Sequence, residues 1–178
     1  AGGSLLLCGN GGSAADCDHI AGELLKGFLL PRVLDREQKF ALCSQGPDGC
    51  VLSKRLQQGF PCISLTGHTA LLTAVSNDNA SDFVFAQQVQ ALGRPGDVLL
   101  GISTSGNARN VYLAALTAKS RGLAVVALSG RDGGLLAKIA DCTVRVPLDE
   151  TFAVQELHLP VYHCICAMLE TAFFAEFA

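Results

Sequence analysis

The chain has 178 residues, of which 13 are Lys or Arg and 16 are Asp or Glu, so its formal net charge is −3. This length can bury a substantial core in one domain without disulfides or metals as staples. The charge balance, with no basic block, argues against a nucleic-acid partner. No apolar run approaches the roughly 20 residues that cross a bilayer, so we expect a soluble protein without a membrane partner.

The eight cysteines do not form the pattern of a disulfide scaffold or of a structural zinc site. Several lie in apolar segments, where cysteine behaves as a small buried hydrophobe, and no C-x-x-C pair is present. Disulfide frameworks belong mainly to short secreted chains. We therefore expect reduced thiols and a cytoplasmic protein.

Short apolar runs alternate with helical patterns along the chain. Continuous apolar runs of this length are typical of strands buried on both faces, and the alternation predicts a three-layer α/β sandwich with a central five-stranded parallel sheet over residues 1–178. In such sheets, ligands bind beyond the carboxyl ends of the strands. The expected strands are 4–8, 61–66, 97–103, 123–129 and 142–147, and the expected helices are 14–28, 81–92, 107–121 and about 151–177.

Two features interrupt this regular pattern. Residues 29–60 form a polar, charge-mixed stretch with two helix-like pieces around "SQGPDG", which predicts a helical excursion between the first two strands. The chain also begins almost directly on a core strand, which leaves room for a preceding helix outside this sequence.

The glycine-rich loop after the first strand allows two interpretations. Gly9, Gly11 and Ala14 satisfy the dinucleotide fingerprint G-x-G-x-x-G/A. That fingerprint also requires an acidic residue about 20 positions on, at the end of the second strand, whereas Asp35 lies in a helix-like segment. A nicotinamide site is therefore disfavoured, and a plain tight turn and an anion-binding loop both stay open.

The stretch "GISTSGNARN" places Ser103, Thr104 and Ser105 between a buried strand and a helix. Three hydroxyls beside helix N-terminal amides suit a phosphate monoester, although a simple N-cap cluster is the alternative. Asn77 and Asp78 could bind sugar hydroxyls or form an Asx-turn. We expect "LSGRDGG", at 128–134, to be only a turn.

Two helical segments carry candidate acid, base and metal-binding side chains. His19 and Glu23 are four residues apart and share a helix face, so they could hold a metal or relay a proton, or form an exposed pair without function. Gln155 and His163 lie roughly 12 Å apart along an ideal helix axis. Pro160, between them, could draw them closer or merely kink the helix.

In order, "GNGGSAADCDHIAGEL", "SND", "GDVLLGISTSGN" and "VQELHLPVYH" resemble the sugar isomerase (SIS) domain family, and within it the phosphoheptose isomerases. The resemblance implies a Rossmann- or flavodoxin-like fold and a homotetramer with active sites between subunits. It implies an enzyme that converts sedoheptulose 7-phosphate to D-glycero-D-manno-heptose 7-phosphate through an enediolate, in lipopolysaccharide heptose biosynthesis.

The resemblance also implies roles for individual residues. Glu23 would be the base, His163 the acid, and one Zn²⁺ per subunit would assist. The implied metal ligands are His19, Glu23, Gln155 and His163. The implied substrate-binding residues are Asn10, Gly11, Gly12, Ser13, Glu23, Asn77, Asp78, Ser103, Thr104, Ser105 and Gln155.

Three departures from the family pattern bear on the substrate. Ala108 stands where the family often has a serine, and Phe152 replaces an acidic residue whose role would move to Glu150 or be absent. The segment 29–60 is longer than usual, which leaves another ketose phosphate open. The alternative from another class is a non-catalytic SIS protein that senses a phosphosugar or binds DnaA, and the presence of all four implied ligands favours the enzyme.

Overall fold

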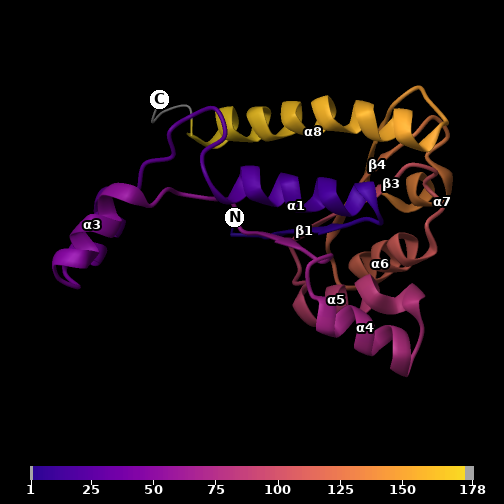
Figure 1. Ribbon diagram of the computed structural model, residues 1–178, viewed down its shortest axis with the longest axis horizontal. Helices are drawn as coiled ribbons and strands as arrows, with labels where there is room; N and C mark the ends of the chain where they lie inside the picture. Colours follow the sequence, from indigo (N-terminus) through magenta and orange to yellow (C-terminus); the bar gives the residue numbers. More distant parts are fainter. Residues whose placement is uncertain (1, 175–178) are drawn as a thin grey trace.

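The computed structural model describes residues 2–174, in which a parallel sheet lies between two helical layers (Figure 1). The strand order is β2-β1-β3-β4-β5, and every neighbouring pair is parallel. The predicted five-stranded α/β sandwich is confirmed, and each strand falls within its expected range. The strands are β1 (Leu5–Cys8), β2 (Cys62–Ser64), β3 (Val98–Ser103), β4 (Ala124–Ser129) and β5 (Cys142–Arg145).

Side chains of the central strands alternate between two cores, because successive residues of a strand point to opposite faces. In β1, Leu6 and Cys8 pack in one core, while Leu7 packs in the other. The apolar runs are continuous rather than alternating for this reason. The first core is covered by α5 (Val84–Leu92) and α6 (Arg109–Ser120), and the second by α1 (Gly12–Leu25) and α8 (Thr151–Phe174).

Helices α1 and α8 lie side by side and run in the same direction (Figure 1). Helix α8 continues through Pro160 and is long and apolar enough to cross a membrane by length and composition. Its inward side chains, including Tyr162 and Cys166, are buried against the sheet and α1. We therefore interpret α8 as a helix of the layered core; its expected extension beyond residue 174 lies outside the described residues.

Two helices were not expected from the sequence. Helix α4 (Thr69–Asp78) stands where we expected only a loop, and the short α7 (Gly134–Ile139) follows the expected turn. A 3₁₀ turn (Ser81–Phe83) then leads into α5. Helix α4 has no fully buried residue, and α7 is only six residues long, so neither gives a clear periodic signal.

The excursion at 29–60 contains the two expected helices, α2 (Arg36–Cys43) and α3 (Pro47–Arg55), and it projects from the layered body (Figure 1). The turn between them is shorter than "SQGPDG" suggested, because Pro47 already starts α3, and proline is well suited to the first helical position. Asp35 caps α2 by accepting a hydrogen bond from the Gln38 backbone amide. Its position as a helix cap agrees with the rejection of a dinucleotide site.

A buried ion pair ties the base of this excursion to α8. The Arg32 and Glu170 side chains are fully buried, and Arg32 Nε donates to Glu170 Oε1 at 2.8 Å. The same carboxylate accepts hydrogen bonds from the backbone amides of Phe28, Leu29 and Leu30. Burial alone would raise the pKa of Glu170, but these donors outweigh it and hold that pKa below its ordinary value.

Candidate active site

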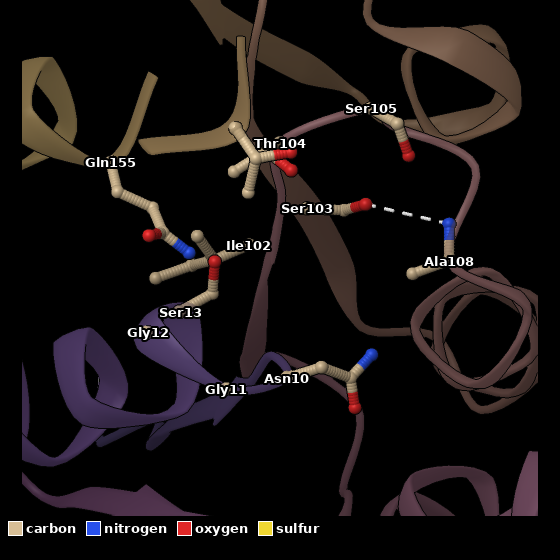
Figure 2. Close-up of a pocket in the computed structure, with 11 residues that line it drawn as sticks. Asn10, Gly11, Gly12, Ser13, Ile102, Ser103, Thr104, Ser105, Ala108 and Gln155 are labelled. Atoms are coloured by element: carbon tan, nitrogen blue, oxygen red, sulfur yellow. Dashed lines mark hydrogen bonds between the residues drawn. The ribbon is translucent and has the colours of Figure 1, made fainter. Parts of the chain in front are cut away.

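A hollow of about 320 Å³ opens at the carboxyl edge of the sheet, between the loops that follow β1 and β3 (Figure 2). In the strand order 2-1-3-4-5 this is the point at which the chain changes direction across the sheet, where open α/β sheets bind ligands. Thr151 of α8, together with Ile102 and Ala108, completes the wall. The sequence-predicted site residues that line it are Asn10, Gly11, Gly12, Ser13, Ser103, Thr104, Ser105 and Gln155.

The loop after β3 directs hydroxyl groups toward this hollow. Ser103 Oγ accepts a long hydrogen bond from the Ala108 amide at 3.4 Å, and Ser105 Oγ accepts one from the Asn107 amide at 3.2 Å. In both contacts the hydroxyl is the acceptor, so its own proton can still be donated to a ligand. The two hydroxyls thus accept hydrogen bonds from backbone amides of the loop that precedes α6, and they can also donate hydrogen bonds to a ligand in the hollow.

The glycines of the loop after β1 bring backbone close to α8. Gly11 has a φ of +54°, a conformation that side chains rarely adopt. A Cβ on Gly12 would stand 2.6 Å from the amide nitrogen of Gln155. Glycine at position 12 therefore leaves the space that the Gln155 amide occupies at the edge of the hollow.

A pair of asparagines separates this hollow from a neighbouring one of about 280 Å³. Asn10 and Asn110 exchange two amide hydrogen bonds, of 2.8 and 2.9 Å. Asn10 lines both hollows, whereas Asn110 lines only the second. Sequence reasoning missed Asn110, because nothing in the helical pattern that contains it distinguishes it from a surface residue.

Further along α1 and α8, His19, Glu23 and His163 come together. His19 Nε2 lies 3.4 Å from Glu23 Oε1, and the rings of His19 and His163 meet edge to face with centroids 5.0 Å apart. Among the described residues, the buried His163 Nε2 has no hydrogen-bond partner. Lys26 Nζ contacts the second carboxylate oxygen of Glu23 at 2.9 Å. The cluster therefore combines a carboxylate, two imidazoles and a cation.

Tyr162 and Asp16 extend this cluster and were not singled out from the sequence. The Tyr162 hydroxyl lies 2.9 Å from His19 Nδ1, and the ring is buried. Burial raises the pKa of Tyr162 to about 12, and the nearby Asp16 carboxylate adds to this. Burial also raises the pKa of Asp16, against the opposing effects of the nearby Tyr162 and His19, and among the described residues its buried Oδ2 has no hydrogen-bond partner. The i,i+3 spacing of Asp16 and His19 on one helix was the available signal.

The structure does not bring Gln155 to the other three implied metal ligands. Helix α8 is unbroken from Gln155 to His163, so the eight-residue separation still corresponds to roughly 12 Å along its axis. Gln155 stands beside Gly12 at the hollow, and His163 stands beside His19. Within residues 2–174, no three His, Cys, Asp or Glu side chains already form a metal-binding group.

The remaining candidates line neither hollow. Asn77 and Asp78 are exposed in the last turn of α4, where the Asn77 amide donates to the Asp78 carboxylate at 2.9 Å. Neither residue lines a hollow. Phe152 is exposed, and neither it nor Glu150 lines the first hollow, whose wall on α8 is formed by Thr151 and Gln155.

Comparison with known proteins shows the family to which the chain belongs. The SIS domain family profile matches residues 52–130. A phosphoheptose isomerase from Geotalea daltonii is 41% identical over 172 residues, which cover 97% of this chain and 77% of that relative. A solved phosphoheptose isomerase from Neisseria gonorrhoeae has 38% identity and a TM-score of 0.75, covering 95% of this chain and 77% of the other. One from Francisella tularensis has 34% identity and a TM-score of 0.77, covering 96% and 78%.

Proposed function

This chain belongs to the phosphoheptose isomerase family of SIS domain proteins and is an isomerase, and from that premise we propose that it converts sedoheptulose 7-phosphate to D-glycero-D-manno-heptose 7-phosphate. The observation that carries the proposal is the arrangement along α1. A hydroxyl-lined hollow lies at the start of that helix, and the carboxylate and imidazole cluster lies two to three turns further on. One end of the site suits a phosphate and the other suits proton transfer.

The spacing of these two parts fits a seven-carbon chain. His19 follows Ser13, at the hollow, by six residues, which is about 9 Å along a helix. An extended chain of seven carbons with bonds of about 1.5 Å spans about 8 Å. A heptose bound by its phosphate at the hollow would therefore reach the cluster with its carbonyl end.

The loop of Ser103, Thr104 and Ser105 would hold the phosphate as a handle. Hydroxyl donors, backbone amides and the N-terminal end of α6 favour an anion without Lys or Arg. The phosphate is not transferred in an aldose–ketose isomerisation, so its binding needs position rather than activation. Gln155, at the edge of the hollow, is placed to contact the sugar hydroxyls next to the phosphate.

At the other end, Glu23 would act as the base. Its carboxylate takes the proton from C1 of the ketose, which forms the enediolate, and returns a proton to C2 to give the aldose. His163 would move the second proton, from the hydroxyl on C1 to the oxygen on C2, so that no proton is gained or lost overall. Lys26 Nζ contacts the carboxylate of this base, 2.9 Å from Glu23 Oε2.

Zinc is part of the proposal, and the side chains present fit it in part. Two imidazoles and a carboxylate are a donor set that zinc binds. Among the described residues, the buried His163 Nε2 has no hydrogen-bond partner, so its lone pair is available to coordinate a metal ion. His19, Glu23 and His163 would hold the ion, whereas Gln155 stands too far along α8 in this conformation. When bound, zinc would stabilise negative charge on the substrate oxygens.

A homotetramer and a cytoplasmic location also belong to the proposal. Phe152, Met168 and Phe173 are each 65% exposed on α8, and exposed apolar side chains of this size along one helix are typical of a surface that another chain covers. In such an assembly, exposed residues of one subunit, such as Asn77 and Asp78, could contact a sugar bound in a neighbouring subunit.

The experiment is a turnover assay of the purified protein with zinc and sedoheptulose 7-phosphate, in which the aldose product is followed by NMR. We expect the parent to interconvert the two sugars and Glu23→Gln to lose a factor of about 10² to 10⁴. Glu37→Gln, a change of the same chemistry on exposed α2, is the matched control and should keep full activity. Binding without turnover by the parent would identify a phosphosugar-binding protein and refute the proposal.

A further inference from the structure

The segment 130–136, which contains most of the stretch "LSGRDGG", lies against the phosphate loop, residues 103–107. We expected this stretch to be only a turn, and none of its residues lines a hollow, so the proposed reaction does not use it directly. Its backbone nevertheless donates hydrogen bonds to the phosphate loop. Gly130 N donates to the Thr104 carbonyl oxygen, and Leu136 N donates to the Gly106 carbonyl oxygen, both at 2.9 Å.

Asn107 links the segment to the phosphate loop through both ends of its side-chain amide. Its Oδ1 accepts a hydrogen bond from the Leu135 backbone amide at 3.0 Å, and its Nδ2 donates to the Ser105 carbonyl oxygen at 2.9 Å. A backbone amide only donates and a carbonyl oxygen only accepts, so these two partners fix the orientation of the Asn107 amide. The Asn107 backbone amide also donates to Ser105 Oγ, at 3.2 Å. Asn107 therefore connects the segment to Ser105, which lines the hollow.

Glycine residues allow the backbones of the segment and the phosphate loop to touch. A Cβ on Gly106 would overlap the carbonyl group of Gly133. A Cβ on Gly134 would stand 2.6 Å from the carbonyl oxygen of Gly106 and 2.7 Å from Asn107 Oδ1. Because backbone atoms cannot move aside as the end of a flexible side chain can, a larger residue at either position would push the segment and the loop apart.

We propose that the segment 130–136 is a positioning element of the phosphate site, which holds the phosphate loop in its binding conformation through Asn107 and through the glycine contact. Ser105 and Asn107 are exposed, and exposed loops are usually mobile. Donors that are already held in place lose less conformational entropy when a ligand binds. The proposal rests on the proposed function, because it assigns the phosphate group of the substrate to this loop.

The first test alters the glycine contact and measures the affinity for inorganic phosphate by ³¹P NMR titration, with no sugar present. Gly134→Ala places a methyl group against Gly106 and Asn107. We expect its dissociation constant for phosphate to rise about 2- to 12-fold, the equivalent of about 0.5–1.5 kcal/mol for one ordinary hydrogen bond.

Gly122→Ala is the matched control for Gly134→Ala. Both glycines have a positive φ, +78° at Gly122 and +55° at Gly134, so alanine strains the backbone at either position. A Cβ on Gly122, however, would meet Pro95 at an ordinary 3.6 Å and would not touch the phosphate loop. Gly122→Ala should therefore bind phosphate like the parent.

The second test is a double-mutant cycle of Asn107→Ala and Ser105→Ala, with the same phosphate titration. Asn107→Ala alone should raise the dissociation constant about 2- to 12-fold. When the Ser105 hydroxyl is already absent, the same change should have an effect below twofold, because a residue that acts through another loses its effect when that other is removed. Asn79→Ala, at the exposed end of α4, is the control and should bind phosphate like the parent. Fold-changes that multiply fully in the double variant would overturn the link through Asn107.

Turnover separates positioning from a general loss of structure. For Asn107→Ala and Gly134→Ala we expect KM for sedoheptulose 7-phosphate to rise by the same factor as the phosphate dissociation constant, while kcat stays within twofold of the parent. Thermal unfolding shows whether the variants fold like the parent. If Gly134→Ala does not fold, the result for Asn107→Ala decides.

Folded variants with the phosphate affinity of the parent would overturn the proposal, and so would a parent that binds no inorganic phosphate. These outcomes differ from those that test the proposed function. A parent without turnover, but with phosphate binding that is weakened in Asn107→Ala and Gly134→Ala, would refute the function alone. An active parent with unchanged phosphate binding in both variants would refute this inference alone.

Discussion

Replacing Glu170 with alanine should destabilise the protein more than replacing its partner Arg32 with methionine, although both changes break the same ion pair. Glu170 accepts four hydrogen bonds, one from Arg32 Nε and three from consecutive backbone amides. Arg32→Met removes only the first of these from the carboxylate. It also removes the guanidinium bonds to the carbonyl oxygens of Leu24 and Glu23.

The magnitudes follow from what each change leaves behind. Breaking a buried ion pair by removing one partner costs about 3–5 kcal/mol, because the remaining charge is uncompensated. Glu170→Ala leaves the charge of the fully buried Arg32 uncompensated. Each backbone amide that loses its acceptor adds about 1–3 kcal/mol to the loss of stability unless water reaches it. The total approaches the whole stability of a typical domain, about 5–15 kcal/mol. Arg32→Met leaves a carboxylate that still has three donors, so we expect about 3–4 kcal/mol.

Urea unfolding, followed by circular dichroism at one fixed protein concentration, gives both free energies of unfolding. We expect Glu170→Ala to lose at least about 2 kcal/mol more than Arg32→Met. Phe40→Ala on α2, whose side chain is 76% exposed, is a control that should change the free energy little. A smaller loss for Glu170→Ala than for Arg32→Met would show that the three backbone donors contribute nothing to stability.

Three further predictions concern acid stability and the hollow. Because the folded-state pKa of Glu170 is lowered, its stabilisation is complete above the ordinary glutamate pKa of about 4.3 and is lost as the pH falls through the lower folded value. Urea midpoints from about pH 6 to 3 should fall more steeply for the parent than for Glu170→Gln, and equal slopes would contradict this. Gly12→Ala should displace the flexible Gln155 amide and raise KM with little loss of stability; an unchanged KM, measured with sedoheptulose 7-phosphate, would count against Gln155 as a sugar contact. Thr104→Ala and Ser105→Ala should each raise KM about 10- to 150-fold, the equivalent of about 1.5–3 kcal/mol for one hydrogen bond to a charged group. If inorganic phosphate still competes as well against these variants as against the parent, the hollow is not the phosphate site.

The sheet and the main helices could be predicted because each strand is a continuous apolar run and its neighbouring helix has an apolar face. Leu6 and Leu7 illustrate this, since adjacent residues of β1 are buried in opposite cores. Helix α4 could not be found in the same way. Leu72 and Val75 are only partly buried against the core, so the signal of its inward face is weak.

The two parts of the candidate site differ in how far the sequence could predict them. The hollow follows from loops at strand ends, and its position beside Ser103 and Asn10 could be expected from the carboxyl-edge rule alone. The contact of His19 with Tyr162 joins residues 143 positions apart and depends on the parallel packing of α1 and α8. Pattern reasoning on either helix alone cannot give that packing.

We propose that this isomerase moves a proton between C1 and C2 of a heptose 7-phosphate through Glu23. The most direct test runs the reaction of sedoheptulose 7-phosphate in D₂O and follows the C2 hydrogen of the aldose product by NMR. A carboxylate base can exchange its proton with solvent between the two steps, so we expect deuterium at C2 with the parent and product formation about 10²- to 10⁴-fold slower with Glu23→Gln. Turnover by Glu23→Gln equal to that of the parent would contradict this role of Glu23.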